Sequence, residues 1–211
     1  MEMRMHETDW AQKYRPVRLE DMILPTSTKQ AFTAMRDSHQ GPSLLLHGPA
    51  GTGKTTTAML LNPDNTHKIN CSAWSKIAEV TALHKQCNTP SLPTFGRRVV
   101  VLDEADCLKP DLQTALRACL EDLSQCNCFV LTANYPQNFI QPLISRLHEV
   151  DFGVMAGNAL LRAAMLERVK LIVEAEGIAA DVSVLRAAVN RWFPDMRKIL
   201  KQLQFEVALV T

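Results

Sequence analysis

The chain has 211 residues, enough for one large domain or two modest ones, and its 46% hydrophobic and 21% charged residues are ordinary for a soluble globular protein. Its formal net charge of +1 excludes a strongly basic chain, so any surface for nucleic acid must be local. The first ten residues carry mixed charges and are no signal peptide, and no run approaches the ~18 apolar residues of a membrane helix. We therefore expect a cytoplasmic protein.

The six cysteines, at positions 71, 87, 107, 119, 126 and 128, form no C-x-x-C pair, and no Cys/His spacing indicates zinc. We interpret them as reduced thiols that are mostly buried as small hydrophobic side chains. The sequence contains no internal repeat and no low-complexity tract.

The first 25 residues are predicted to form an extended arm, because they mix aromatic, basic and proline residues and Pro16 disfavours helix just before it. A helix is expected over about residues 26–39, and Gly41-Pro42 breaks it.

Residues 43–47 are a short apolar run of strand length, and residues 48–55 read G-x-x-x-x-G-K-T, the pattern of a phosphate-binding loop. Its glycines let the backbone curl, and the free N–H groups at the start of the following helix favour a bound phosphate. Lys54 would reach the β- and γ-phosphates, and the Thr55 hydroxyl would hold magnesium. A chance glycine-rich turn is the alternative. The predicted ATP-binding residues here are Gly48, Pro49, Ala50, Gly51, Thr52, Gly53, Lys54, Thr55 and Thr56.

A second strong signal lies at residues 97–104. The apolar run over residues 99–102 suits a strand buried on both faces of a parallel sheet. Asp103 at its end can hold the magnesium through water. Glu104, turned to the other side by strand alternation, can accept a proton from an attacking water as general base. Two solvated carboxylates are the alternative.

Further elements complete an alternating pattern. We expect a strand at 66–70, poor in apolar residues, a helix at 75–87, a loop at 88–95, a helix at 108–123, a strand at 127–132, a helix at 140–147 and a strand at 150–152. This alternation predicts a doubly wound parallel sheet with its site at the carboxyl ends of the strands. Asn134 would end one strand beside that site and orient the attacking water, a turn-forming Asn being the alternative.

After residue 153 the pattern becomes helical. Apolar residues recur at helical spacing up to Gly177, a second helix starts at Asp181, and a third starts at Pro194 or Asp195. We therefore divide the chain into an α/β core with its arm, residues 1–153, and a small all-helical lid, residues 154–211.

The order of these motifs resembles that of an AAA+ P-loop NTPase. The motifs are Gly48 to Thr55, Asp103-Glu104, Leu131-Thr132-Ala133-Asn134, Ser145-Arg146 and Pro194-Asp195-Met196-Arg197. Lys13-Tyr14-Arg15-Pro16 with Leu19-Glu20-Asp21 resembles the opening of clamp-loader subunits of the replication factor C type. The segments 23–25, 142–146, 176–179 and 193–198 resemble most the ATPase subunit of T-even-type phage clamp loaders.

The resemblance implies roles for three residues. Asn134 would be sensor 1, Arg146 an arginine finger acting on ATP in the neighbouring subunit, and Arg197 sensor 2, contacting the γ-phosphate of its own ATP. Guanidinium groups suit phosphate, and such fingers contribute ~10³–10⁵ in rate in other NTPases. The alternatives are a surface salt bridge of Arg146, for instance with Glu149, and a solvated helix face for Arg197.

The resemblance also implies that the arm lines an adenine pocket with Tyr14, Arg15, Pro16 and Ile23, the alternative being an ordered strap over the core. In the family, the helix that follows the acidic pair couples DNA to the ATP site. The candidate contacts to DNA phosphates are Lys76, Lys109 and Arg117, with Arg97 or Arg98 as further possibilities, and solvated surface charges are the alternative for each.

Taken together, the resemblance implies an ATPase subunit that uses ATP and Mg²⁺ to open a sliding clamp and load it on primer–template DNA, within a ring or spiral of subunits. The helical collar domain that normally follows the lid is expected to be absent, since the chain stops at Thr211. Another AAA+ remodeller, such as a helicase loader or branch-migration motor, is one alternative, and the segment 13–21 argues against it. A non-hydrolysing interaction subunit is another, and the presence of Lys54, Glu104 and Arg146 argues against that.

Overall fold

The computed structural model describes residues 9–89 and 96–208 of the chain. The chain forms two compact units. The sheet unit comprises Gln30–Gly48 and Lys54–Phe152, and the helical unit comprises the chain up to Lys29, the segment Pro49–Gly53 and the chain from Gly153 on. Most of the loop predicted over residues 88–95 lies outside the described residues.

The sheet unit is built on a parallel sheet of five strands in the order β2-β3-β4-β1-β5. The strands are β1 Leu44–His47, β2 Thr66–Asn70, β3 Arg98–Asp103, β4 Asn127–Ala133 and β5 His148–Asp151. Every residue of β4 is buried, as expected for a central strand covered on both faces. The doubly wound parallel sheet predicted from the alternating pattern is therefore confirmed.

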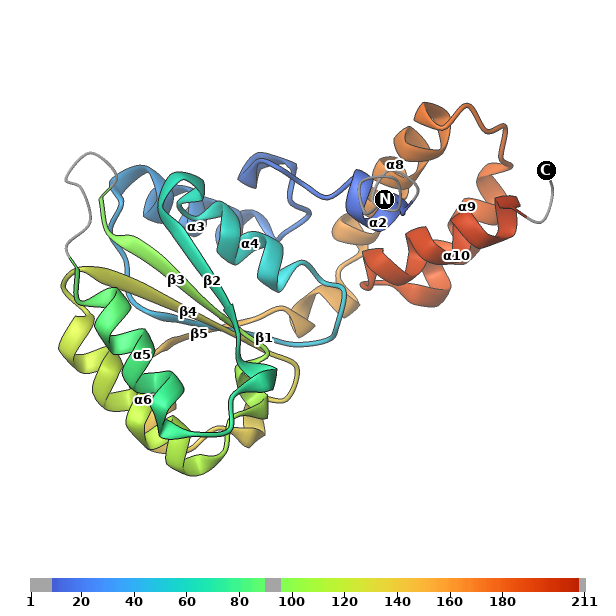
Figure 1. Cartoon of the computed structure of the whole chain (residues 1–211). Coiled ribbons are helices and arrows are strands. Elements are labelled where there is room, and N and C mark those ends of the chain that lie inside the picture. Colours follow the sequence, from blue (N-terminus) through green and yellow to red (C-terminus); the bar gives the residue numbers. More distant parts are fainter. Residues whose placement is uncertain (1–8, 90–95, 209–211) are drawn as a thin grey trace, which may run out of the picture. The chain divides into compact units, whose positions relative to one another are not determined.

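Helices cover both faces of this sheet. They are α3 Thr26–Ser38, α4 Lys54–Leu60, α5 Ile77–Cys87, α6 Pro110–Leu123 and α7 Gln141–Ile144. Figure 1 shows α5 and α6 against one face, with α4 and most of α3 against the other. Leu83 and Leu116 are buried with Phe129 of β4 in the core between α5, α6 and the sheet. The helix that follows β1 thus lies on one face, and the helices that follow β2 and β3 lie on the other. In open α/β sheets, ligands bind where the helices change face, at the carboxyl ends of the strands.

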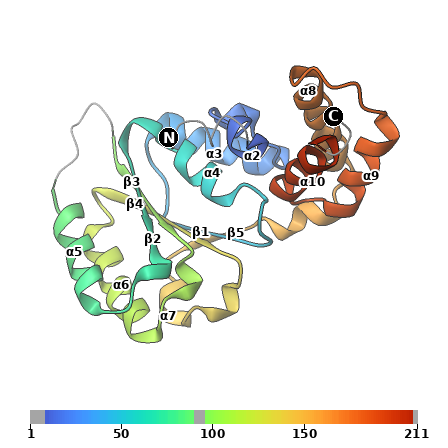
Figure 2. The same cartoon turned by 45° about the vertical axis from the view of Figure 1, so that its right-hand side comes forward.

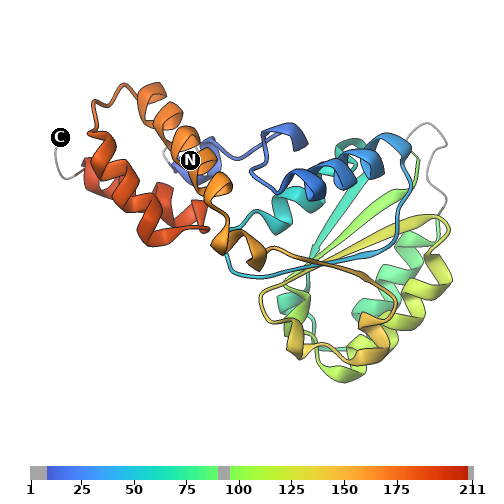
Figure 3. The same ribbon diagram turned by 180° about the vertical axis from the view of Figure 1, so that it is seen from behind.

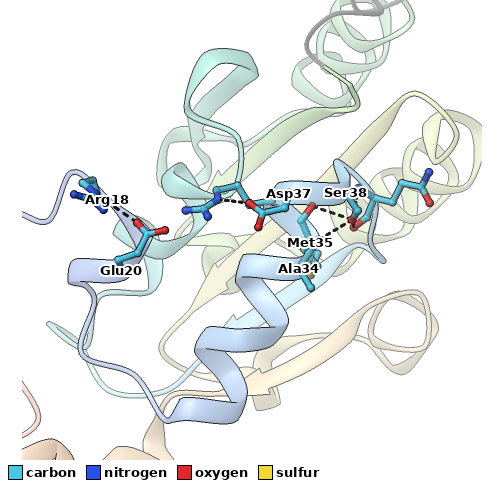
Figure 4. Close-up of polar contacts among 8 residues, drawn as sticks. Arg18, Glu20, Ala34, Met35, Asp37 and Ser38 are labelled. Carbon is cyan, nitrogen blue, oxygen red and sulfur yellow. Dashed lines mark hydrogen bonds and ion pairs between the residues drawn. The ribbon is translucent and has the colours of Figure 1, made fainter.

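The end of α3 shows how the predicted break operates. The Ser38 hydroxyl donates to the carbonyl of Ala34 at 2.7 Å and so satisfies a carbonyl in the last turn (Figure 4). His39 then adopts a left-handed conformation with φ of 52°, and Gly41-Pro42 follows. The helix therefore ends close to where the sequence predicted, and β1 begins five residues after His39.

Several boundaries differ from the prediction by two or more residues. The helix α6 begins at Pro110 rather than residue 108, because Ala105–Cys107 forms a 3-10 turn first. Because α7 ends at Ile144 and not at residue 147, β5 can begin at His148, before the predicted residue 150.

The helical unit contains α2 Trp10–Lys13, α8 Ala159–Ala175, α9 Val182–Trp192 and α10 Met196–Ala208. Figure 2 shows α8, α9 and α10 grouped together, and Figure 3 shows the group from behind. Trp10 is buried in their shared core with Val169 and Ile199. No helix in the described part of the chain is long and apolar enough to cross a bilayer.

The prediction of a fully extended arm was wrong at Trp10–Lys13, which forms α2. The Asp9 side chain accepts a hydrogen bond from the Ala11 amide and so caps this helix. The Trp10 amide also donates to Gln204 Oε1 at 3.1 Å, so α10 fixes the arm from the other end of the sequence. Burial of Trp10 in a distant core stabilises a short helix that a local pattern does not predict.

Glu176, at the end of α8, holds the same arm through two contacts. Its Oε1 accepts from Lys13 Nζ at 2.7 Å and from the Tyr14 hydroxyl at 2.5 Å. The hydrogen bond from Lys13, followed by the one from Tyr14, lowers the pKa of the Glu176 carboxyl from its ordinary value. The ionised carboxylate is thus the form that the folded helical unit favours.

We predict that Glu176→Gln removes part of the pH dependence of stability. The lowered pKa of Glu176 means that its contribution is present above about pH 4.5, the usual pKa of a glutamate, and is lost as the pH falls through the lower folded value. The wild-type melting temperature should exceed that of the variant at pH 6, and the two should converge once the pH has fallen through the lowered pKa of Glu176. Exposed Glu174→Gln is the control, and an equal effect of both changes would contradict the assignment.

Candidate nucleotide site

The loop between β1 and α4 follows a path that its glycines permit. Gly48, Gly51 and Gly53 have φ values of 131°, 72° and 93°, in the region that side chains disfavour. Within the helical unit, a Cβ on Gly51 would lie only 1.7 Å from Oδ1 of Asp195. The Thr52 hydroxyl donates to the carbonyl of Pro49 at 2.9 Å and braces the turn. The sequence pattern is therefore matched by a tight glycine loop that leads directly into the first turn of α4.

Lys54 and Asn134, predicted independently, lie in contact. Residues His47 and Ala133 are paired in the register of β1 and β4, so the chain leaves both strands side by side. Lys54 Nζ donates to the Gly48 carbonyl at 2.7 Å and to Asn134 Oδ1 at 2.9 Å. The lysine is buried, with only 7% of its surface exposed. The ammonium group is thus held at the mouth of the loop before any phosphate arrives.

Asp103 collects three donors from three other elements. The hydroxyls of Thr55 and Thr132 each donate to its Oδ1 at 2.6 Å. Lys68 of β2 forms an ion pair with its Oδ2 at 2.8 Å. Burial works to raise the pKa of Asp103, but these hydrogen bonds, the one from Lys68 foremost, outweigh it and hold the pKa below its usual value. The carboxylate is therefore ionised and fixed in orientation.

Glu104 is exposed and follows β3 rather than continuing it. Its φ of 58° and ψ of 41° are left-handed, which is rare for a residue other than glycine and is typical of functional sites. Its amide donates to Thr132 Oγ1 at 3.1 Å. Strand alternation was therefore the wrong reason for separating Glu104 from Asp103, because a left-handed turn separates them.

Two residues that the sequence analysis passed over support the predicted ones. Asp106 Oδ2 accepts from the amides of Asn134 and Tyr135 at 3.0 and 2.9 Å, and so anchors the turn that carries Asn134. Thr132 links Asp103 to the amide of Glu104. Thr132 stands inside a quoted motif, and Asp106 lies two residues after the Asp103-Glu104 pair. The available signal was therefore the strand hydroxyl and the third carboxylate.

Gln113 is fully buried in the first turns of α6. Its amide donates to the carbonyls of Leu108 and Asn138 at 2.8 and 2.9 Å, and its Oε1 accepts from the Ile140 amide at 2.8 Å. Two of these three hydrogen bonds join α6 to the segment after Asn134, and the third holds the Leu108 carbonyl just before the helix. Gln113 is therefore a rigid link between the helix and the nucleotide site.

The two predicted phosphate-binding arginines lie in different units. Arg146, between α7 and β5, is exposed and pairs with Glu121 of α6 at 2.5 Å, and not with Glu149 as the alternative suggested. Arg197 is exposed in the first turn of α10, next to Asp195, whose carboxylate accepts from the Lys198 amide at 2.9 Å. Neither position tests the predicted contact with ATP, which stays a prediction.

The arm residues predicted to line the adenine pocket have mixed environments. Tyr14 and Ile23 are half-buried against the core of the helical unit, Pro16 is half-buried, and Arg15 is exposed. Thr56 is half-buried in α4. These positions remain predictions for nucleotide contacts.

Lys76 and Lys109 are the exposed N-cap residues of α5 and α6. Both helices follow the carboxyl ends of strands, and helix N-termini favour anions. Arg117 lies half-buried in the middle of α6, and its buried Nε has no hydrogen-bond partner in the part of the chain that the structure describes.

Arg97 and Arg98, by contrast, stand at the amino end of β3. Arg97 donates to the carbonyls of Gly41, Ser124 and Asn127, and Arg98 to those of Gln86 and Thr89. Both guanidinium groups thus bind backbone carbonyls at the amino end of β3, the opposite end of that strand from Asp103, which argues against a role in phosphate binding.

The residues fit a magnesium–nucleotide complex. Thr55 and Asp103 bring a hydroxyl and a carboxylate oxygen within 2.6 Å, and hard oxygen ligands of this kind suit Mg²⁺. Lys54 supplies a cation next to the loop, and the glycine turn leads into the first turn of α4, where backbone amides can donate to phosphate oxygens.

Comparison with known proteins agrees with this geometry. Residues 44–153 match the ATPase family associated with various cellular activities (AAA). The chain belongs to this family. The matched AAA segment runs from the start of β1 past the end of β5, so it contains the glycine loop, both acidic residues and Asn134.

Curated relatives show to which proteins within this family the chain is similar. Replication factor C small subunit 2 of Pyrobaculum islandicum is 32% identical and covers 97% of this chain, and the small subunit of Halobacterium salinarum is 34% identical and covers 92%. The chain spans 65% and 62% of their lengths. Two RuvB variants from Thermotoga maritima share the fold with a TM-score of 0.71 at 19% and 20% identity, over 92% and 93% of this chain and 65% and 66% of theirs.

We predict that Thr132→Val destabilises the sheet unit, because it removes a donor to Asp103 and leaves the Glu104 amide without its acceptor. A loss of about 1–3 kcal/mol in the free energy of unfolding is expected, measured by urea denaturation. Thr57→Val is the matched control. The Thr57 hydroxyl is fully buried and has no hydrogen-bond partner among the described residues, so its removal should cost nothing or stabilise slightly. Equal losses for both variants would contradict the proposed network.

Proposed function

We propose that this chain is the ATPase portion of a clamp-loader subunit of the replication factor C type, which binds ATP with Mg²⁺ and uses hydrolysis to load a sliding clamp on primer–template DNA. The observation that carries the proposal is the meeting of Lys54, Thr55, Asp103 and Asn134 at the carboxyl end of the sheet. The similarity to curated small subunits over 97% of the chain supports the clamp-loader assignment.

The chain's own groups would act as follows. Lys54 and the loop amides bind the β- and γ-phosphates, while Thr55 and Asp103 hold the magnesium. Magnesium supplies neutralisation of phosphate charge. Asn134, fixed by Asp106, orients the attacking water, and Glu104 accepts its proton. Because Glu104 is exposed and set apart by its left-handed turn, it can reach a water without disturbing Asp103.

The wider assembly is part of the same proposal. Arg146 is exposed on the sheet unit, as a residue acting on a neighbouring subunit's ATP must be. Arg197 would contact the γ-phosphate in its own subunit, with Tyr14, Arg15, Pro16 and Ile23 around the adenine. Lys76, Lys109 and Arg117 would bind DNA phosphates without reading sequence, which suits a loader that must act at any primer end. The closer resemblance to the ATPase subunit of T-even-type phage clamp loaders and a cytoplasmic location stay predictions from the sequence.

We predict that Lys54→Ala abolishes binding of ATP, whereas Glu104→Gln retains binding and lowers hydrolysis by about 10²–10⁴-fold. Lys54 acts on phosphates in the ground state, but Glu104 acts only on the water. Binding is measured by isothermal titration calorimetry with ATP and Mg²⁺, and turnover by phosphate release. Wild-type turnover in the Glu104→Gln protein would rule out the general base.

A second prediction concerns the assembled loader. With the partner subunits, clamp and primed DNA present, Arg146→Ala should lower stimulated ATP turnover by about 10³-fold or more while ATP binding is kept. Mixing it with Lys54→Ala should restore some turnover, because each protein supplies what the other lacks at one interface. Glu121→Gln is the matched control, since it removes the same ion pair but keeps the guanidinium. If Glu121→Gln lowers turnover as much as Arg146→Ala does, the loss is due to the broken ion pair, and the role of Arg146 as an arginine finger is contradicted.

A further inference from the structure

Lys68 is a cation at the magnesium-binding carboxylate that no sequence motif pointed to. It lies on β2, the edge strand of the sheet, in register with Val101 of β3, while Asn70 pairs with Asp103. Lys68 lies two residues before Asn70, so the two side chains project from the same face of the sheet. From this diagonal position, a long side chain can reach Asp103 on the neighbouring strand. Its Nζ lies 2.8 Å from Asp103 Oδ2.

The two oxygens of Asp103 have different partners. Oδ1 accepts from two neutral hydroxyls, those of Thr55 and Thr132. Oδ2 takes the only charged partner that the described contacts of this carboxylate include, the ammonium of Lys68. The other lysine of the site, Lys54, is occupied by Gly48 and Asn134. The two lysines thus have different partners: Lys54 contacts the phosphate loop and Asn134, and Lys68 contacts Asp103.

We propose that Lys68 is a built-in counterion that holds Asp103 in place before nucleotide binds and competes with the divalent cation for that carboxylate. This rests on the proposed function in one respect, that Asp103 is a magnesium ligand. The Asp103 side chain is only 14% exposed, so its charge needs a partner when no metal is bound. An ammonium beside the carboxylate supplies that partner, but it also repels an arriving Mg²⁺.

The exposure of Lys68 makes the exchange feasible. Its side chain is 39% exposed, so the ammonium can move into water on its flexible stem when the metal takes the carboxylate. The loaded site would then bind divalent cation less tightly than a site without the lysine, and the nucleotide-free protein would be more stable than one without it. Lys68 is in this sense a positioning residue that sets the magnesium requirement of the site.

The test is a Mn²⁺ titration followed by the electron paramagnetic resonance of the free ion, with the protein holding a non-hydrolysable ATP analogue. Lys68→Met keeps the aliphatic stem and removes the charge, and should lower the Mn²⁺ dissociation constant about three- to tenfold. Lys68→Arg keeps the charge and should stay within about twofold of wild type. Lys85→Met, on the exposed surface of α5, controls for net charge and should change nothing.

A second readout needs no metal. The nucleotide-free Lys68→Met protein should melt below wild type, and saturating metal and analogue should remove or reverse that difference. An unchanged Mn²⁺ dissociation constant in Lys68→Met would contradict the proposal that Lys68 competes with the divalent cation. A raised constant would also contradict it, and would mean that the lysine helps to hold the bound phosphates. If wild type itself shows no metal-dependent binding of the analogue, both this inference and the proposed function fail. If wild type binds the analogue in a metal-dependent way and Lys68→Met binds it equally well, the inference fails but the proposed function stands.

Discussion

The carboxylate of Asp103 joins four elements of the sheet unit. It receives Thr55 from α4, Thr132 from β4 and Lys68 from β2, and it ends β3 itself. Such a buried polar network stabilises one arrangement only when all of its members are present, because an unpaired charge at 14% exposure is costly. The positions of Glu104 and of the first turn of α4 both depend on this carboxylate.

The parallel register explains why the acidic residue and the loop meet. β1 lies next to β4, and β4 next to β3, so the residues that leave these strands at their carboxyl ends are neighbours in space. Lys54 and Asn134, 80 positions apart in the sequence, thereby come within 2.9 Å. The order of the strands, more than any single segment, therefore brings the residues of this site together.

The sequence predicted most of this sheet because its signals are local. The glycine loop and the buried run before Asp103 are each recognisable within eight residues. Lys68 could not be assigned in this way, because its role depends on the register of β2 against β3. The left-handed backbone of Glu104 was also beyond reach, since it opposes the preference of an ordinary residue and is held by tertiary contacts. Burial of Trp10 by α10 likewise decided the helix in the arm.

That contact between the arm and α10 has a consequence for how the protein is made. The Trp10 amide and Gln204 are 194 positions apart, so the helical unit cannot complete its core until nearly all of these residues have left the ribosome. The sheet unit is encoded between them and can fold first. Once folded, it replaces a long flexible loop by a fixed span, which lowers the entropic cost of joining the two ends. Until α10 has been made, the indole of Trp10 lacks the core in which it is buried in the folded protein.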